Sequence, residues 1–123
     1  MVCLVDVLAT CVAVTGRSLP TEAGPDSFNL LPVLLGQKRD KPVRDHLIEQ
    51  SRRMGVRQGQ WKLVTAGGAG RAAKGKEASA PPELYNLADD LGETRNLARQ
   101  HPEKVRELAA LWQQVRSKDR SRP

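Results

Sequence analysis

The feature that most restricts the fold of this chain is a helical pattern close to its C-terminal end. Apolar side chains recur there at intervals of three and four residues, at Val105, Leu108, Ala109, Trp112 and Val115. Pro102 suits the first helical position, and Glu103 suits the positive end of the helix dipole. A helix with one apolar stripe needs another apolar surface to cover, so the pattern predicts an amphipathic helix of about four turns packed on a sheet.

The strands of that sheet are predicted from a change of period in the middle of the chain. DHLIEQS and MGVRQG are short runs bounded by polar residues and glycine, and QWKLVTA alternates apolar with polar side chains. The Gln58-Gly59 dipeptide is a tight-turn signal, so Val56 and Trp61 are expected on paired strands of a hairpin. ELYNL, at 83–87, is expected to add a further short strand. The predicted fold class is α+β, with a small antiparallel β-sheet and a C-terminal amphipathic helix packed on it.

Two helices are expected before the sheet. The run VCLVDVLATCVAV predicts a buried helix from Val2 to Val14, although Asp6 interrupts its apolar character. No basic region precedes the run, and it is shorter than the roughly 20 residues of a membrane span, so neither a signal peptide nor a membrane segment is expected. A short second helix is expected after Asp26 or Ser27 as its N-cap. The compartment is left open.

Composition restricts the possible partners. The net charge is +6, and the excess of basic residues lies after residue 40. These basic residues alternate with acidic ones, and no aromatic platform accompanies them, so nucleic-acid binding is not expected. The segment AGGAGRAAKGKEASAPP has almost nothing to bury and predicts a flexible loop at 67–81.

The carboxylates Asp89, Asp90 and Glu93 are the strongest candidates for acid–base chemistry. The structural interpretation is favoured, because aspartates in a turn hydrogen-bond to nearby backbone amides and Gly92 can supply a positive φ. No metal-ligand cluster, phosphate loop or serine elbow is present in the sequence. A lone histidine such as His46 is more often structural than catalytic. The residues by themselves therefore predict a folded module without catalytic or metal-binding residues.

The order of the motifs resembles the C-terminal region of the arylsulfatase family, the formylglycine-dependent sulfatases. The matching segments are D-x-L-A-T followed by TG, DSFNLLPVLLG, VRQGQWKLV, ELYNLADDLGETRNLA and HPEKVRELAALW. They cover nearly the whole chain. The resemblance implies that residues 1–40 are the tail, with its helices, of a large α/β sulfatase domain, and that residues 41–123 form the smaller C-terminal subdomain.

For an intact family member, the resemblance implies hydrolysis of a sulfate ester by a formylglycine, with a bound calcium ion. The formylglycine arises from Cys or Ser in a C/S-x-P-x-R motif, but Cys11 is followed by Ala13 and Thr15 where that motif needs Pro and Arg. The family's catalytic and metal-binding residues lie upstream of the matched region. The chain is therefore expected to be a sulfatase fragment that lacks its N-terminal catalytic domain and is inactive alone.

Two residues are weak candidates for contacting an anionic substrate in the intact enzyme, Arg44 and His46. Arg57 and Lys62 are expected to be strand residues with their charges at the surface. Two alternatives stay open from the sequence: a stand-alone basic module that binds sulfated polysaccharide, and a truncated product without function.

Overall fold

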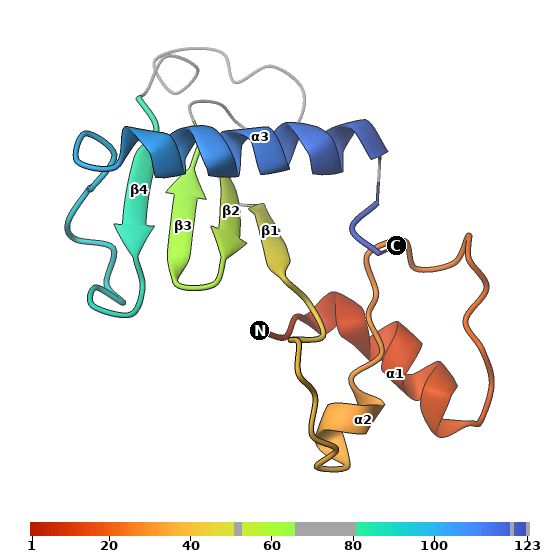
Figure 1. Cartoon of the computed structure of the whole chain (residues 1–123). Coiled ribbons are helices and arrows are strands. Elements are labelled where there is room, and N and C mark those ends of the chain that lie inside the picture. Colours follow the sequence, from red (N-terminus) through yellow and green to blue (C-terminus); the bar gives the residue numbers. More distant parts are fainter. Residues whose placement is uncertain (51–52, 66–80, 119, 123) are drawn as a thin grey trace. The chain divides into compact units, whose positions relative to one another are not determined.

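The computed structural model describes residues 1–50, 53–65, 81–118 and 120–122. The loop predicted at 67–81 lies almost entirely outside the described residues. The chain divides into two compact units (Figure 1). Unit 1 contains Met1–Asp45 and the C-terminal residues from Val115, and unit 2 contains His46–Gln114. Among the described residues, no helix is both long and apolar enough to cross a membrane.

Unit 2 contains a four-stranded antiparallel sheet with the strands in chain order. The strands are β1 (His46–Gln50), β2 (Met54–Gln58), β3 (Trp61–Val64) and β4 (Glu83–Asn86). In the β2–β3 hairpin, Gln58 pairs with Trp61 and Val56 pairs with Leu63. Gly59 has a φ of 57°, a left-handed conformation that glycine adopts without steric cost. The predicted hairpin is thus confirmed.

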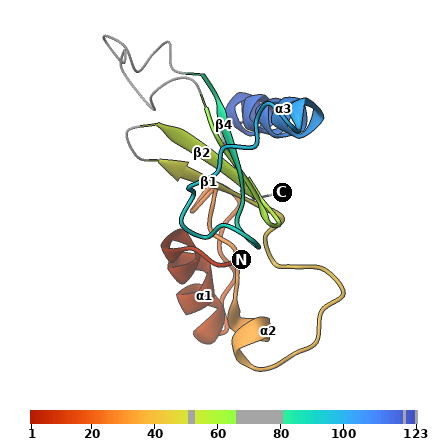
Figure 2. The same cartoon turned by 90° about the vertical axis from the view of Figure 1, so that its left-hand side faces the viewer.

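Helix α3 (Pro102–Lys118) covers one face of this sheet, as Figures 1 and 2 show. Leu108 of α3 is fully buried and forms the core with one residue each from β2, β3 and β4: Val56, Leu63 and Leu84. Val105, Ala109 and Trp112 pack against this core from the same helix. The predicted α+β class, with an antiparallel sheet and a C-terminal helix on it, is confirmed.

The Met1–Asp45 part of unit 1 contains three short helical segments, which are η1 (Leu4–Asp6), α1 (Val7–Val14) and α2 (Leu31–Leu34). Pro32 lies in the first turn of α2, where its missing N–H costs no hydrogen bond. The predicted N-cap of this helix was wrong, because α2 begins after Leu30. Ser27 has another partner, since its Oγ accepts a hydrogen bond from the backbone N–H of Ala9 at 2.9 Å.

The expectation that the first helix is buried is also wrong for the chain as it stands. Ala9 is the only residue of α1 that is buried, whereas Val7, Leu8 and Val14 are about half exposed or more. The reason is that the described residues of unit 1 cover one side of α1 only.

Candidate functional site

Arg44, the first predicted substrate-contacting residue, is buried in unit 1 with 2% of its surface exposed. Its Nη2 lies 2.6 Å from Asp6 Oδ1 and donates a hydrogen bond of 2.8 Å to the backbone carbonyl of Asp26. Its guanidinium also lies 4.6 Å from the centre of the Phe28 ring. These contacts give Arg44 a structural role, and contact with an anionic substrate stays a prediction.

Asp6, which interrupts the apolar run in the sequence, joins several segments of unit 1. Its Oδ1 accepts hydrogen bonds from Arg44 and from the Phe28 N–H, and its Oδ2 accepts one from the Cys3 N–H. Burial alone raises the pKa of Asp6, but the hydrogen bonds from Arg44, Phe28 and Cys3 outweigh burial and lower the pKa below its usual value. Sequence reasoning missed this pair because 38 residues separate its members.

His46, the second predicted site residue, begins β1 and is 8% exposed. It pairs with Gln58 across the sheet. Arg44 belongs to unit 1 and His46 to unit 2, so neither unit by itself brings the two candidates together.

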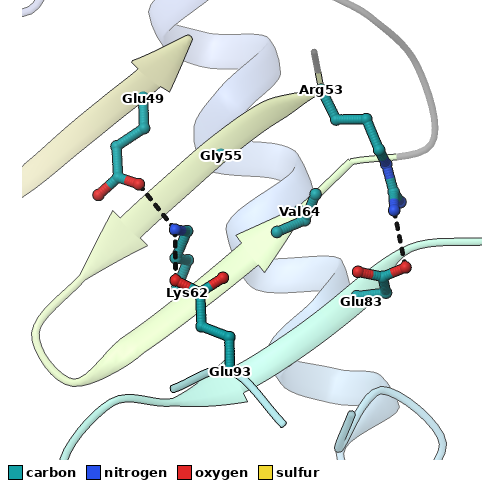
Figure 3. A pocket seen from close by; sticks show the side chains of 7 residues that line it. All are labelled: Glu49, Arg53, Gly55, Lys62, Val64, Glu83 and Glu93. Carbon is teal, nitrogen blue, oxygen red and sulfur yellow. Dashed lines mark hydrogen bonds and ion pairs between the residues drawn. The ribbon is translucent and has the colours of Figure 1, made fainter. Parts of the chain in front are cut away.

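A charged groove of about 270 Å³ lies on the sheet of unit 2. It is on the face opposite α3, because Lys62 and Val64 alternate along β3 with the core residue Leu63 (Figure 3). We call this the charged groove; its lining residues are Glu49, Arg53, Gly55, Lys62, Val64, Glu83 and Glu93.

Lys62 bridges two carboxylates of the charged groove. Its Nζ lies 2.9 Å from Glu49 Oε2 and 2.6 Å from Glu93 Oε1. Burial alone lowers the pKa of Lys62, but the hydrogen bonds to Glu93 and Glu49 outweigh it and raise the pKa above its usual value. The prediction that the charge of Lys62 lies at the surface is wrong, since its side chain is only 16% exposed.

The glycine in β2 lies beneath this bridge. A Cβ added to Gly55 would lie 3.4 Å from both Glu49 Cβ and Lys62 Cε. The side chain of Lys62 crosses β2 beside Gly55 and reaches Glu49 on β1, as Figure 3 shows. A glycine inside a strand is the sequence signal that indicates such a close approach.

Arg53 makes the second ion pair of the groove. Its Nη1 lies 2.7 Å from Glu83 Oε1, and it also donates hydrogen bonds to the carbonyls of Thr65 and Pro81. Glu83 Oε2 accepts a hydrogen bond from the Tyr85 hydroxyl at 2.9 Å. The hydrogen bond from Arg53 lowers the pKa of Glu83, while burial and the bond to Glu83 raise the pKa of Tyr85 to about 12.

The sequence offered Asp89, Asp90 and Glu93 as candidates for acid–base chemistry. In the structure, these residues lie in the connection between β4 and α3. Asp90 accepts hydrogen bonds from the N–H groups of Thr94 and Arg95, which lower its pKa, and Asp89 accepts one from Asn86. The turn interpretation is confirmed for Asp90, whereas the partner of Asp89 is the side-chain amide of Asn86 and not a backbone amide.

The positive φ of this turn falls on a different residue from the one predicted. Glu93, not Gly92, has the left-handed conformation, with a φ of 55°. This conformation costs a non-glycine residue about 1 kcal/mol. The ion pair with Lys62 offsets that cost.

Ion pairs organise the charged groove. Arg53 and Lys62 each contact at least one carboxylate, and the raised pKa of Lys62 keeps it protonated at neutral pH. A protonated lysine is neither a general base nor a nucleophile. Within the described ranges, no group of three or more His, Cys, Asp or Glu side chains could hold a metal ion.

Comparison of the sequence with known proteins shows which family the chain resembles. No protein-family model matches the chain. An N-acetylgalactosamine-6-O-sulfatase of Bacteroides thetaiotaomicron is 33% identical in an alignment of 122 positions, and the alignment spans 93% of this chain and 23% of that protein. The resemblance to the C-terminal region of the sulfatases is confirmed. The chain spans about a quarter of the length of this curated relative.

Solved sulfatase structures have the same fold over the matched region. One, from work on glycosaminoglycan metabolism by Bacteroides thetaiotaomicron, is 33% identical with a TM-score of 0.70, covering 91% of this chain and 24% of that chain. Another, a 2-O GAG sulfatase, is 25% identical with a TM-score of 0.70, covering 93% of this chain and 25% of that chain.

Proposed function

We propose that this chain is the C-terminal part of a sulfuric ester hydrolase and works only together with a larger catalytic domain. The proposal rests on how much of each protein takes part in the match. The match extends over 93% of this chain but over only 23% of the relative. The relative therefore has a large region with no counterpart here. In the intact enzyme, that region supplies the nucleophile, the metal site and the binding of the sulfate ester.

The residues of this chain do not fit the cofactors that the family implies. Cys11 lacks the Pro and Arg that a formylglycine motif needs, and the described residues contain no metal-binding group. No step of sulfate-ester hydrolysis is therefore assigned to this chain. Its contribution to the enzyme is structural, apart from the predicted contacts of Arg44 and His46 with the substrate.

A chimera tests this proposal. In it, the present chain replaces the matching region of the Bacteroides N-acetylgalactosamine-6-O-sulfatase, and release of inorganic sulfate from N-acetylgalactosamine 6-sulfate is measured. The chimera is expected to hydrolyse this sulfate ester, whereas the chain alone and the relative without its matching region are expected to release no sulfate above the blank. Turnover by the chain alone, or a folded chimera without turnover, would refute the proposal.

A further inference from the structure

We propose that residues 120–122 form a strap that holds the loop at 20–26 closed, and that releasing this strap opens the loop while the rest of the chain stays folded. We call these two segments the strap and the strapped loop. Both belong to unit 1, although Pro20 and Arg122 are 102 positions apart in the sequence. The inference goes beyond the proposed function, because it concerns a motion within this chain.

The strapped loop has fewer N–H donors than carbonyl acceptors. It contains Pro20 and Pro25, which have no N–H, and Gly24 has a left-handed φ of 57° that interrupts any regular structure. Within the loop, the Ala23 N–H donates to the Pro20 carbonyl at 3.1 Å. The remaining carbonyl groups need donors from another part of the chain.

Arg122 supplies these donors. Its Nη2 lies 2.9 Å from the carbonyl oxygens of both Pro20 and Thr21, and 3.1 Å from the carbonyl oxygen of Ala23. Its backbone N–H donates to the Pro25 carbonyl at 2.9 Å. Hydrogen bonds from a charged guanidinium are stronger than those between neutral groups, so this one residue closes most of the loop. Figure 1 shows the end of the chain beside the orange segment that follows α1.

Asp26 joins the strapped loop to the buried part of unit 1. Its Oδ1 accepts a hydrogen bond of 2.7 Å from the Ser121 N–H of the strap, at the surface. Its backbone carbonyl accepts the hydrogen bond of 2.8 Å from Arg44, which is almost fully buried. The exposed contacts of the strap therefore end at the residue where the buried contacts of Arg44 begin.

The strapped loop has the features of a segment that opens before the core does. The hydrogen bonds from Arg122 to Pro20 and Thr21 are exposed, and none of the residues 20–26 is buried. The backbone of the loop does pack closely at Gly24, where an added Cβ would lie 3.0 Å from Leu8 Cδ2. Exposed hydrogen bonds and few buried apolar contacts lower the free energy of local opening.

Opening is expected to stop before Phe28. The Phe28 N–H donates to Asp6 Oδ1 at 3.0 Å, and the Phe28 ring lies 4.6 Å from the Arg44 guanidinium. Ser27 is buried, and its Oγ accepts the hydrogen bond from the Ala9 N–H. None of these contacts involves the strap. The amides on the two sides of this boundary therefore distinguish local opening from unfolding of unit 1.

Hydrogen exchange of single amides, followed by NMR spectroscopy of the full chain, tests the proposal. The variant Arg122→Gln removes the guanidinium of the strap, and the control Arg116→Gln makes the same change at an exposed position of α3. The Ala23 amide is expected to exchange roughly tenfold faster in Arg122→Gln, because loss of the guanidinium favours opening. The amides of Phe28 and of the core residue Leu63 should keep their rates. Arg116→Gln should change none of the three rates.

A second variant ends at Lys118 and lacks the strap entirely, so its Ala23 amide should exchange at least as fast as in Arg122→Gln. Unchanged exchange of Ala23 in both variants would overturn the strap. Equal acceleration at Ala23, Phe28 and Leu63 would show a loss of global stability and would overturn the local opening. If neither variant folds, residues 120–122 belong to the global folding unit, and the proposal also falls.

Discussion

At the residue scale, Lys62 is the centre of the charged groove. Replacing it by Met leaves Glu49 and Glu93 without their shared cation, and hydrogen bonds to charged groups contribute roughly 1.5–3 kcal/mol each. We expect Lys62→Met to lower the free energy of unfolding by about 2 kcal/mol in urea titrations, a value reduced for partial exposure. The matched control is Lys104→Met, which removes an exposed pair with Glu107 and should cost less than about 0.5 kcal/mol. Equal losses in the two variants would contradict this role.

The ion pair of Glu83 with Arg53 predicts a pH dependence at the same scale. Because the folded-state pKa of Glu83 lies below its usual 4.5, its ionisation contributes stability that is complete above about pH 4.5 and lost as the pH falls through the folded-state pKa. Glutamine cannot ionise, so the difference in melting temperature between the unaltered chain and Glu83→Gln should shrink as the pH is lowered from about 6 to about 3. A difference that stays constant over this range would argue against the pair.

At the element scale, the Asp6–Arg44 pair joins η1 to the segments that follow α1. Removing one partner of a buried pair leaves an uncompensated charge, which costs about 3–5 kcal/mol. Arg44→Met is therefore expected to destabilise the chain strongly, and Asp6→Leu in addition should recover part of the loss. The measurement is a double-mutant cycle by denaturant unfolding. Additive losses would show that the two side chains do not act as a pair.

The same variants separate the structural role of Arg44 from the predicted contact with substrate. In the chimera, a purely structural Arg44 predicts that the double variant recovers both stability and turnover together. A raised KM that persists in the double variant, after stability has returned, would instead support contact with the sulfate ester.

The elements that sequence reasoning predicted are those with local signals. The stripe of α3 and the hairpin around Gly59 depend on residues that are close in sequence, so their patterns are visible there. The Asp6–Arg44 pair and the bridge from Lys62 to Glu49 and Glu93 connect residues far apart, and no local pattern indicates them. We predicted the positive φ at Gly92 because glycine adopts it without steric cost. The structure has it at Glu93, where the ion pair with Lys62 stabilises it.

The candidate site was predicted less well than the fold. The sequence drew attention to Arg44 and His46, which lie in different units, and it did not predict the charged groove. Only the register of three antiparallel strands brings Glu49, Gly55 and Lys62 together. Such a cluster can be recognised only once the pairing of the strands is known.

At the scale of the whole molecule, the sheet and α3 of unit 2 have a core of their own, whereas α1 of unit 1 keeps an apolar side exposed. This contrast agrees with a chain that spans about a quarter of the sulfatase it matches. Unit 2 needs little from outside to bury its apolar residues. The described residues of unit 1 leave Val7, Leu8 and Val14 of α1 exposed.

We have proposed that this chain is the C-terminal part of a sulfatase, and the DNA directly upstream of its coding region gives the sharpest test of that claim. Sequencing that DNA in the source genome is expected to show a reading frame, continuous with this one or separated by a single disruption, that encodes C/S-x-P-x-R. Upstream DNA without any frame encoding that motif would contradict the claim.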